Sequence, residues 1–453
     1  MTLDSERGAG PEGYNRTALG VVAICFASIV FDGYDLIVYG TVVPALLEYR
    51  EWDLTAVEAG AIGSYALIGM LFGAMMVGTI TDIVGRRKIM LFCISWFSLF
   101  MGLCATAPSP ELLGLFRFIA GLGLGGVVPT AIALTIEYAP PHRRSFTNAL
   151  MFSGYSVGGI LAALLAIPLL PAFGWRLMFA IGLAPLVLIV PLAYKFMPES
   201  VSFLVASGRR EEAEELARRY GISLDPEASS TSPDEASTWK DKLRALFSRR
   251  YAPATGLFWI SCFIGLLLVY GLNTWLSQIM LEAGYPLGSA LSFLLVLNLG
   301  AILGTPLAGA AADRFGSKLV TAGGFLVAAA SIALLSVQPP LWAIYVLVAL
   351  AGVGSVGTTI IVNAYTAKYY PADRRATALG WSLAFGRLGA ILGPLYGGYV
   401  IAYTASQLGF EWNFYAFAIP ALLGTLVILL VPRLPVAERA PLPSEARGAA
   451  PTS

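Results

Sequence analysis

Residues 69–85 of the chain spell GMLFGAMMVGTITDIVG, and residues 300–316 spell GAILGTPLAGAAADRFG. The two stretches share four glycines and one aspartate at identical spacing, 231 residues apart. The same offset aligns Ala120-Gly-Leu-Gly123 with Ala351-Gly-Val-Gly354. Self-similarity at a fixed period is the signature of a chain built from copies of one structural unit. The sequence therefore predicts two similar halves.

Composition decides the class of protein. Of 453 residues, 57% are hydrophobic and 13% are charged, whereas about a quarter of the residues in soluble domains are charged. A helix that crosses a bilayer needs about 20 consecutive apolar residues. Twelve such segments lie near residues 18–43, 57–80, 89–107, 112–138, 146–170, 177–196, 253–280, 287–311, 319–337, 341–367, 377–403 and 412–432. We predict an all-α polytopic membrane protein of twelve transmembrane helices in two six-helix repeats.

A polar stretch between residues 198 and 251 separates the two sets of six segments. Within it, residues 207–220 have the composition of a helix. A parallel repeat of six helices is typical of transporters whose halves move around a site at the membrane midplane. The predicted organisation is an N-terminal tail (1–17), an N-terminal half (18–196), a linker (197–252), a C-terminal half (253–432) and a C-terminal tail (433–453).

The basic residues predict the orientation, because Lys and Arg accumulate in the cytoplasmic loops of membrane proteins. With a cytoplasmic N-terminus, 25 of the 29 Lys and Arg residues fall on the cytoplasmic side. Only Arg50 and Arg176 fall outside, and only Arg117 and Arg387 lie within helices. We expect a multi-pass protein of the plasma (cell inner) membrane with both termini cytoplasmic and no removable signal peptide. The excess of Lys and Arg on one side reflects the orientation of the protein in the membrane, so we expect no nucleic-acid partner.

Two carboxylates lie in the first predicted helix. Asp32, Asp35 and Tyr39 are spaced three and four residues apart, which places them on one helix face. The repeat positions of the two acids are Phe263 and Leu266, so the acids belong to one half only. Burial and mutual repulsion favour protonation of one of the pair, and intramembrane acids are commonly functional. We predict that Asp32 and Asp35 couple proton binding to transport; the alternative is that they pair with an arginine and hold helices together.

Two intramembrane arginines also break the repeat, since Arg117 aligns with Val348 and Arg387 with Ser156. A guanidinium matches a carboxylate with two parallel hydrogen bonds. We therefore predict Arg387 as the anchor of an anionic substrate, with a structural ion pair to one of the aspartates as the alternative. Arg117, near the outer end of the fourth helix, either relays charge to the aspartates or extends to the membrane interface. We count it with Arg387 among the candidate substrate-binding residues.

The seventh helix carries the run Tyr270-Gly-Leu-Asn273-Thr-Trp275. An amide, a hydroxyl and two aromatic rings at membrane depth can flank a planar ring and hydrogen-bond its edge. Asn273, Trp275 and, similarly, Tyr39 are therefore candidate substrate contacts. The alternative is that these side chains pack the helices or anchor them at the interface.

The loop from Gly78 to Lys88 joins the second and third helices, and we interpret it as part of a gate. Asp82 can cap a neighbouring helix N-terminus, Gly85 permits a tight turn, and Arg86 can reach Glu137. The corresponding loop of the other half, around Asp313, matches this pattern less closely. Lys368 stands there at the position that Glu137 has in the first half. We call these two sets of cytoplasmic contacts, one in each half, the inner latches, and we expect them to differ.

Other chemistry finds little support in the sequence. His142 is the only histidine and lies in a loop, and the four cysteines lie within predicted helices without metal-ligand spacing. There is no phosphate-binding glycine loop and no nucleophile elbow. We expect no enzyme activity, no metal and no cofactor.

With these residues in view, nearly the whole chain resembles the major facilitator superfamily and, within it, the aromatic acid:proton symporters. The resemblance is carried by Asp32-Gly-Tyr-Asp35, by the loop 78–88, by Arg117 to Pro129 with Glu137-Tyr138, by Asn273-Thr-Trp275, and by Gly386-Arg387 with Gly393-Pro394. It implies that Asp32, Asp35, Arg117 and Arg387 are needed for uptake. It assigns supporting positions to Asp82, Arg86, Glu137, Asp313 and Arg375.

The resemblance also bears on substrate and direction. Relatives that take hydroxylated benzoates often have a histidine where Lys318 stands and usually a proline where Ser277 stands, and residues 32–44 look more like the benzoate-type branch. The helix-five element Gly154 to Gly159 lacks the proline of efflux antiporters, which favours import.

We predict a monomeric, proton-coupled importer of a small aromatic carboxylate, benzoate or a hydroxybenzoate-like acid, that works by alternating access in the lipid bilayer. The alternatives are a proton symporter for another organic acid or a sugar, and a non-transporting membrane sensor that keeps the fold.

Overall fold

The structure is a computed structural model that describes residues 16–140, 143–220, 244 and 246–432. The two tails, most of the second part of the linker and His142 lie outside the described residues, as does the side chain of Asp82. Twelve helices of the described chain are long and apolar enough to cross a membrane. The predicted all-α fold with twelve spans is confirmed.

The N-terminal half contributes six spans, and the sixth is interrupted by a turn of 3₁₀-helix. A short two-helix segment of the linker, α8 and α9, follows; the helix expected at 207–220 begins at Arg210. The elements are α1 (Arg16–Leu47), α2 (Ala56–Val84), α3 (Arg86–Ala105), α4 (Pro110–Tyr138), α5 (Arg144–Phe173), α6 (Trp175–Ala180), η2 (Ile181–Leu183), α7 (Ala184–Phe196), α8 (Val201–Ala206) and α9 (Arg210–Tyr220).

The C-terminal half contributes the other six spans, and a five-residue π-helical segment interrupts the tenth. Its elements are α11 (Ala252–Glu282), α12 (Leu287–Phe315), α13 (Ser317–Leu335), α14 (Leu341–Gly352), η3 (Val353–Gly357), α15 (Thr358–Tyr369), α16 (Ala372–Gln407) and α17 (Glu411–Leu430).

The glycines shared by 69–85 and 300–316 make the same contact in both halves. A methyl group on Gly69 would overlap the carbonyl oxygen of Phe118, and one on Gly300 would overlap that of Ala349. Phe118 and Ala349 are themselves 231 residues apart. Small residues let helix backbones approach closely where no side chain intervenes. The repeat is thus the contact of the second helix with the fourth, made once in each half.

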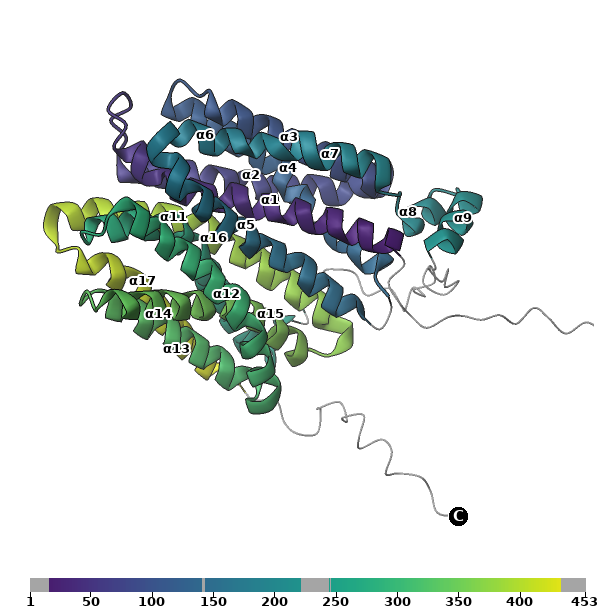
Figure 1. The fold of residues 1–453 in the computed structure, drawn as a ribbon. Helices are drawn as coiled ribbons and strands as arrows, with labels where there is room; N and C mark the ends of the chain where they lie inside the picture. Colours follow the sequence, from purple (N-terminus) through teal and green to yellow (C-terminus); the bar gives the residue numbers. More distant parts are fainter. Residues whose placement is uncertain (1–15, 141–142, 221–243, 245, 433–453) are drawn as a thin grey trace, which may run out of the picture.

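The two halves meet through α2 with α16, α5 with α12 and α1 with α11. Ser64 donates a hydrogen bond to the carbonyl oxygen of Ile391 at 2.6 Å, and Gly40 lies directly against the backbone of Asn273. Ser64, Gly40 and Asn273 all lie in the part of their helices away from α8 and α9. We call the end of the bundle that carries α8 and α9 the linker end. The contacts of Ser64 with Ile391 and of Gly40 with Asn273 thus join the halves at the end opposite α8 and α9, which Figure 1 shows at one end of the bundle.

Candidate functional site

A buried ion pair joins α1 to α4. Arg117 Nη1 lies 2.8 Å from Asp35 Oδ1, and both side chains are only 1% exposed. The same nitrogen donates to the backbone oxygen of Asp35 at 3.2 Å, and the guanidinium lies over the rings of Tyr39 and Phe179. Of the two placements considered for Arg117, the structure has the one beside the acid, and the side chain does not extend to the membrane interface.

Asp32 lies three residues away from Asp35 and has a different environment. Its side chain is 2% exposed, and its Oδ1 atom has no hydrogen-bond partner within the described part of the chain; the same holds for Asp35 Oδ2, so the difference lies in the bond of Asp35 Oδ1 to Arg117. The charged groups that act on it are Asp35 on its own helix and Arg387 on α16. Asp32 therefore faces the C-terminal half, whereas Asp35 is bonded within the N-terminal half.

Arg387 reaches this region because α16 packs closely on α11. Gly389 lies directly against the backbone of Phe263, and Gly386 lies against Cys262 and Leu266. The arginine is partly exposed and interacts electrostatically with Asp32 across the boundary between the halves. An acid from one half and a guanidinium from the other thus share one region, and each lies near the middle of its helix.

Two tyrosines complete the region; Tyr270 belongs to the helix-seven run noted in the sequence, whereas Tyr155 was not among the candidates. Tyr155 on α5 and Tyr270 on α11 both interact with Asp32, with Arg387 and with each other. The Tyr155 hydroxyl is buried and approaches the Tyr270 side chain closely enough to interact with it, without a hydrogen bond of good geometry. The repeat offered a signal for both positions, because Tyr155 precedes Ser156, the counterpart of Arg387, and Tyr270 is the counterpart of Tyr39.

The other three candidate substrate contacts have their polar groups bonded within the protein. The Tyr39 hydroxyl donates to the carbonyl oxygen of Ala59 at 2.5 Å, and Trp275 Nε1 donates to that of Pro394 at 2.6 Å. The Asn273 amide donates to its own helix and accepts from Asn298 at 3.0 Å. All three side chains are buried where the halves meet, at the end opposite the linker.

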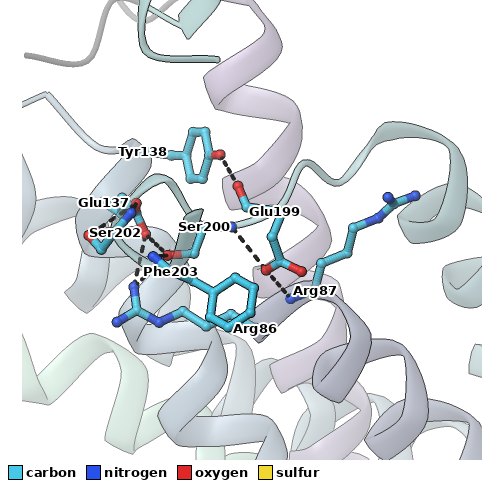
Figure 2. A network of polar contacts seen from close by, with 8 residues as sticks. All are labelled: Arg86, Arg87, Glu137, Tyr138, Glu199, Ser200, Ser202 and Phe203. Carbon is cyan, nitrogen blue, oxygen red and sulfur yellow. Dashed lines mark hydrogen bonds and ion pairs between the residues drawn. The ribbon is translucent and has the colours of Figure 1, made fainter. Parts of the chain in front are cut away.

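A second polar cluster lies at the linker end of the N-terminal half (Figure 2). Arg86 Nη1 lies 2.9 Å from Glu137 Oε2, as expected from the sequence, and also donates to Ser200 Oγ at 2.8 Å. Glu137 accepts further hydrogen bonds from Ser200 Oγ and from the backbone nitrogen of Ser202. Glu137 therefore connects the start of α8 with the ends of α3 and α4 that lie at the linker end.

The tight turn between α2 and α3 depends on Gly85, whose φ of +103° belongs to the region that favours glycine. Glu199 occupies the start of α3, where its Oε1 atom accepts a hydrogen bond from the backbone nitrogen of Arg87 at 2.9 Å. The Tyr138 hydroxyl donates to the carbonyl oxygen of Glu199 at 2.7 Å (Figure 2). A carboxylate from the linker thus caps α3, a contact that the sequence did not suggest.

The corresponding cluster in the C-terminal half is simpler. Lys368 Nζ lies 3.0 Å from Asp313 Oδ1, and these side chains are 60% and 76% exposed. Arg375 is exposed at the start of α16. The two latches differ, as expected from the exchange of Glu137 for Lys368 between the repeats. Their role as gates stays a prediction.

The family model for the Major Facilitator Superfamily matches residues 25–305 and 291–453. The chain is 42% identical to the benzoate transport protein of Acinetobacter baylyi, over 91% of this chain and 89% of the relative. It is 40% identical to the gentisate transporter of Corynebacterium glutamicum, over 93% and 89%, and 33% identical to the gallate transporter of Pseudomonas putida, over 90% of each.

Solved structures support the fold. The inward-open xylose transporter XylE from E. coli superposes with a TM-score of 0.74 at 17% identity, covering 93% of this chain and 98% of that one. A bacterial homologue of the human lysosomal transporter Spinster gives a TM-score of 0.69 at 17% identity, covering 92% and 96%. The chain therefore belongs to the major facilitator superfamily, within its group of aromatic acid transporters, and is a membrane transporter and not an enzyme.

Proposed function

We propose that the protein is a proton-coupled symporter that imports a small aromatic carboxylate, benzoate or a hydroxybenzoate-like acid, across the plasma membrane by alternating access. The observation that carries this proposal is Asp32, a buried acid with an open carboxylate oxygen that faces Arg387 across the boundary between the halves. Protonation and substrate binding then act on one region that both halves share.

The arrangement of charges gives the coupling a physical reason. The Asp35–Arg117 pair is neutral within itself, and without substrate Asp32 and Arg387 neutralise each other. A substrate carboxylate that binds Arg387 leaves Asp32 as an uncompensated buried charge, which is costly at membrane depth. Protonation of Asp32 removes that charge. We therefore expect one proton for each carboxylate.

This stoichiometry fixes the driving force. One anion and one proton together carry no net charge, so the membrane potential does not act on the transported pair. A pH difference of one unit supplies about 1.4 kcal/mol, which corresponds to about tenfold accumulation. Uptake should therefore follow the pH gradient.

The distribution of Lys and Arg favours an orientation in which the linker end faces the cytoplasm. In this orientation the contacts of Ser64 with Ile391 and of Gly40 with Asn273 lie toward the outside, and we infer that the halves are closed on that side. Tyr39, Asn273 and Trp275 then contribute to the outer closure. The site uses residues of both halves of one chain, so we infer that a monomer is the transporting unit.

The substrate class rests on the relatives, whose names specify benzoate, gentisate and gallate. These acids share a benzene ring with one carboxylate. A planar carboxylate suits the guanidinium of Arg387, and the rings of Tyr155 and Tyr270 are the aromatic surfaces beside it.

Uptake of labelled benzoate into proteoliposomes under an imposed pH gradient tests the proposal. We expect uptake that a protonophore abolishes, that other aromatic acids inhibit more strongly than aliphatic acids do, and that Asp32→Asn removes. Asp313→Asn, which changes an exposed acid far from the site, serves as the matched control and should retain uptake. Uptake that ignores the protonophore and survives Asp32→Asn would exclude proton coupling.

A further inference from the structure

The faces of α2 and α16 that join the halves at one end of the bundle are uncovered at the other end. A methyl group on Gly60 would meet the backbone of α16, whereas one on Gly78 would meet no described atom within 4 Å. A methyl group on Gly398 would meet the backbone of α2, whereas one on Gly380 would likewise meet nothing among the described residues within 4 Å. The glycines of each helix are 18 residues apart, which is about five turns and returns to the same helix face. The two helices therefore touch at the end opposite the linker and separate toward the linker end.

Five aromatic rings of the C-terminal half form a row that starts at this separation, beside Gly380. We call them the aromatic row; they are Phe247, Trp259, Phe263, Trp381 and Phe385. Trp259 of α11 stacks on Trp381 and Phe385 of α16, with ring centroids 6.0 and 5.3 Å apart. The ring of Phe247 is perpendicular to that of Trp259 at 5.5 Å, and Phe263 lies 6.1 Å from Phe385. Phe247 and Trp381 are 50% and 40% exposed, so the row is not part of the closed core.

One end of the aromatic row lies beside the site. Phe385 precedes Arg387 by two residues, and Phe263 is the repeat counterpart of Asp32. The other end, Phe247, lies just before α11, which begins at the linker end. A carboxylate that leaves Arg387 toward the linker end therefore has these rings along its way.

The indole nitrogen of Trp259 has unused bonding capacity. Its Nε1 atom is buried and has no hydrogen-bond partner in the part of the chain that the structure describes. The indoles of Trp96 and Trp275 differ, since they donate to the carbonyl oxygens of Ile119 and Pro394 at 2.9 and 2.6 Å. A buried Trp N–H usually has such a partner, and an aromatic face is only a weak acceptor. The aromatic row thus combines stacking surface with one open donor, which is the chemistry that an aromatic carboxylate can use.

We propose that the aromatic row is an exit subsite, a second binding site that the transported aromatic carboxylate occupies between Arg387 and the cytoplasm. This inference rests on the proposed function and adds a step of substrate release to it. The ring of the acid stacks on the exposed indole of Trp381, and its carboxylate accepts a hydrogen bond from Trp259 Nε1. The nitrogen is covered in the present arrangement, so the Trp259 ring turns to make this bond.

The exit subsite binds more weakly than the site at Arg387. A guanidinium offers a charge and two parallel hydrogen bonds to a carboxylate, whereas an indole offers one hydrogen bond and no charge. Conduction through a membrane requires sites that bind well enough to receive the substrate and weakly enough to let it leave. A stacked, singly bonded site on the cytoplasmic side of Arg387 meets this requirement.

Equilibrium dialysis of labelled benzoate against the purified full-length protein tests the inference. The wild-type protein should bind benzoate at two sites, the second weaker than the first. Trp259→Phe keeps a ring but removes the donor, so it should weaken the second site by about ten- to hundredfold, as expected for one hydrogen bond to a charged group. Trp381→Leu removes the stacking surface and should weaken the second site by about two- to tenfold. Both variants should keep the first site, which shows in the same experiment that they are folded.

The matched control is Trp342→Phe, which changes a tryptophan that is 71% exposed at the start of α14 and should leave both sites unchanged. Cyclohexanecarboxylate has the same carboxylate without an aromatic face, so it should bind the second site more weakly than benzoate does. Equal affinity of the two acids there would contradict the stacking.

A wild-type protein with one site only, or a second site that Trp259→Phe and Trp381→Leu leave intact, overturns the inference and leaves the proposed function standing. Benzoate that merely partitions into detergent gives the latter result. A wild-type protein that binds no aromatic carboxylate overturns both the inference and the proposed function.

Discussion

Removal of Arg117 should destabilise the protein strongly, because its partner would remain buried. Asp35 and Arg117 are each 1% exposed and meet at 2.8 Å. Neither charge is screened by solvent, so the small values measured for surface pairs do not apply. Loss of one partner of a buried pair typically costs about 3–5 kcal/mol, since the remaining charge has no compensation. We expect Arg117→Gln to lower the free energy of unfolding by about that amount.

The matched rescue is the double variant Asp35→Asn with Arg117→Gln, which removes both charges and keeps two groups able to hydrogen-bond. Its stability should return to within about 1–2 kcal/mol of wild type, because replacing a complete buried pair is often close to neutral. Thermal or denaturant unfolding in detergent, arranged as a double-mutant cycle, measures the coupling between the two positions. If the single variant unfolds like wild type, or if the double variant is as unstable as the two single losses combined, the pair does not have the role assigned to it.

Further predictions concern packing and the linker. Gly33→Ala should destabilise the protein by about 1–3 kcal/mol, because the added methyl meets the Tyr155 backbone, whereas Gly20→Ala on the same helix meets nothing within 4 Å and should be neutral in an unfolding measurement. Glu199→Gln replaces a charged cap of α3 with a neutral one and should lower the free energy of unfolding by about 0.5–2 kcal/mol. An unchanged unfolding midpoint would exclude this cap. The control is Glu212→Gln, which changes an exposed pair with Arg209.

Much of the fold could be predicted from the chain, since twelve apolar segments and a gap-free repeat leave few other arrangements. The interruptions of two of the spans could not be predicted in this way. The 3₁₀ turn Ile181–Leu183 precedes Pro185, and the π-helical segment Val353–Gly357 lies in a glycine-rich run. Both are local adjustments of helices that hydropathy reports only as continuous apolar segments.

The charged residues of the site could be selected from the sequence because charge in a membrane is rare, but their pairing could not. Asp32 and Asp35 differ by three positions, about 4.5 Å along a helix. Whether Arg117 meets the first or the second depends on how α1 and α4 are rotated against each other. Tyr155 carried a weaker signal, since an aromatic residue in an apolar span resembles ordinary packing and only its place next to the repeat counterpart of Arg387 marked it. The folded chain sets it apart by bringing its side chain close to Tyr270, Asp32 and Arg387.

The most direct test of the central claim is proton movement that accompanies the substrate. Proteoliposomes with a pH-sensitive dye inside receive an aromatic carboxylate outside without any imposed pH gradient, with protein-free liposomes as the background for passive permeation. Wild-type protein should acidify the interior faster than the background, at a rate that clamping the membrane potential leaves unchanged. Asp32→Asn should bind the carboxylate yet acidify only at the background rate. Acidification by Asp32→Asn at the wild-type rate would contradict the account.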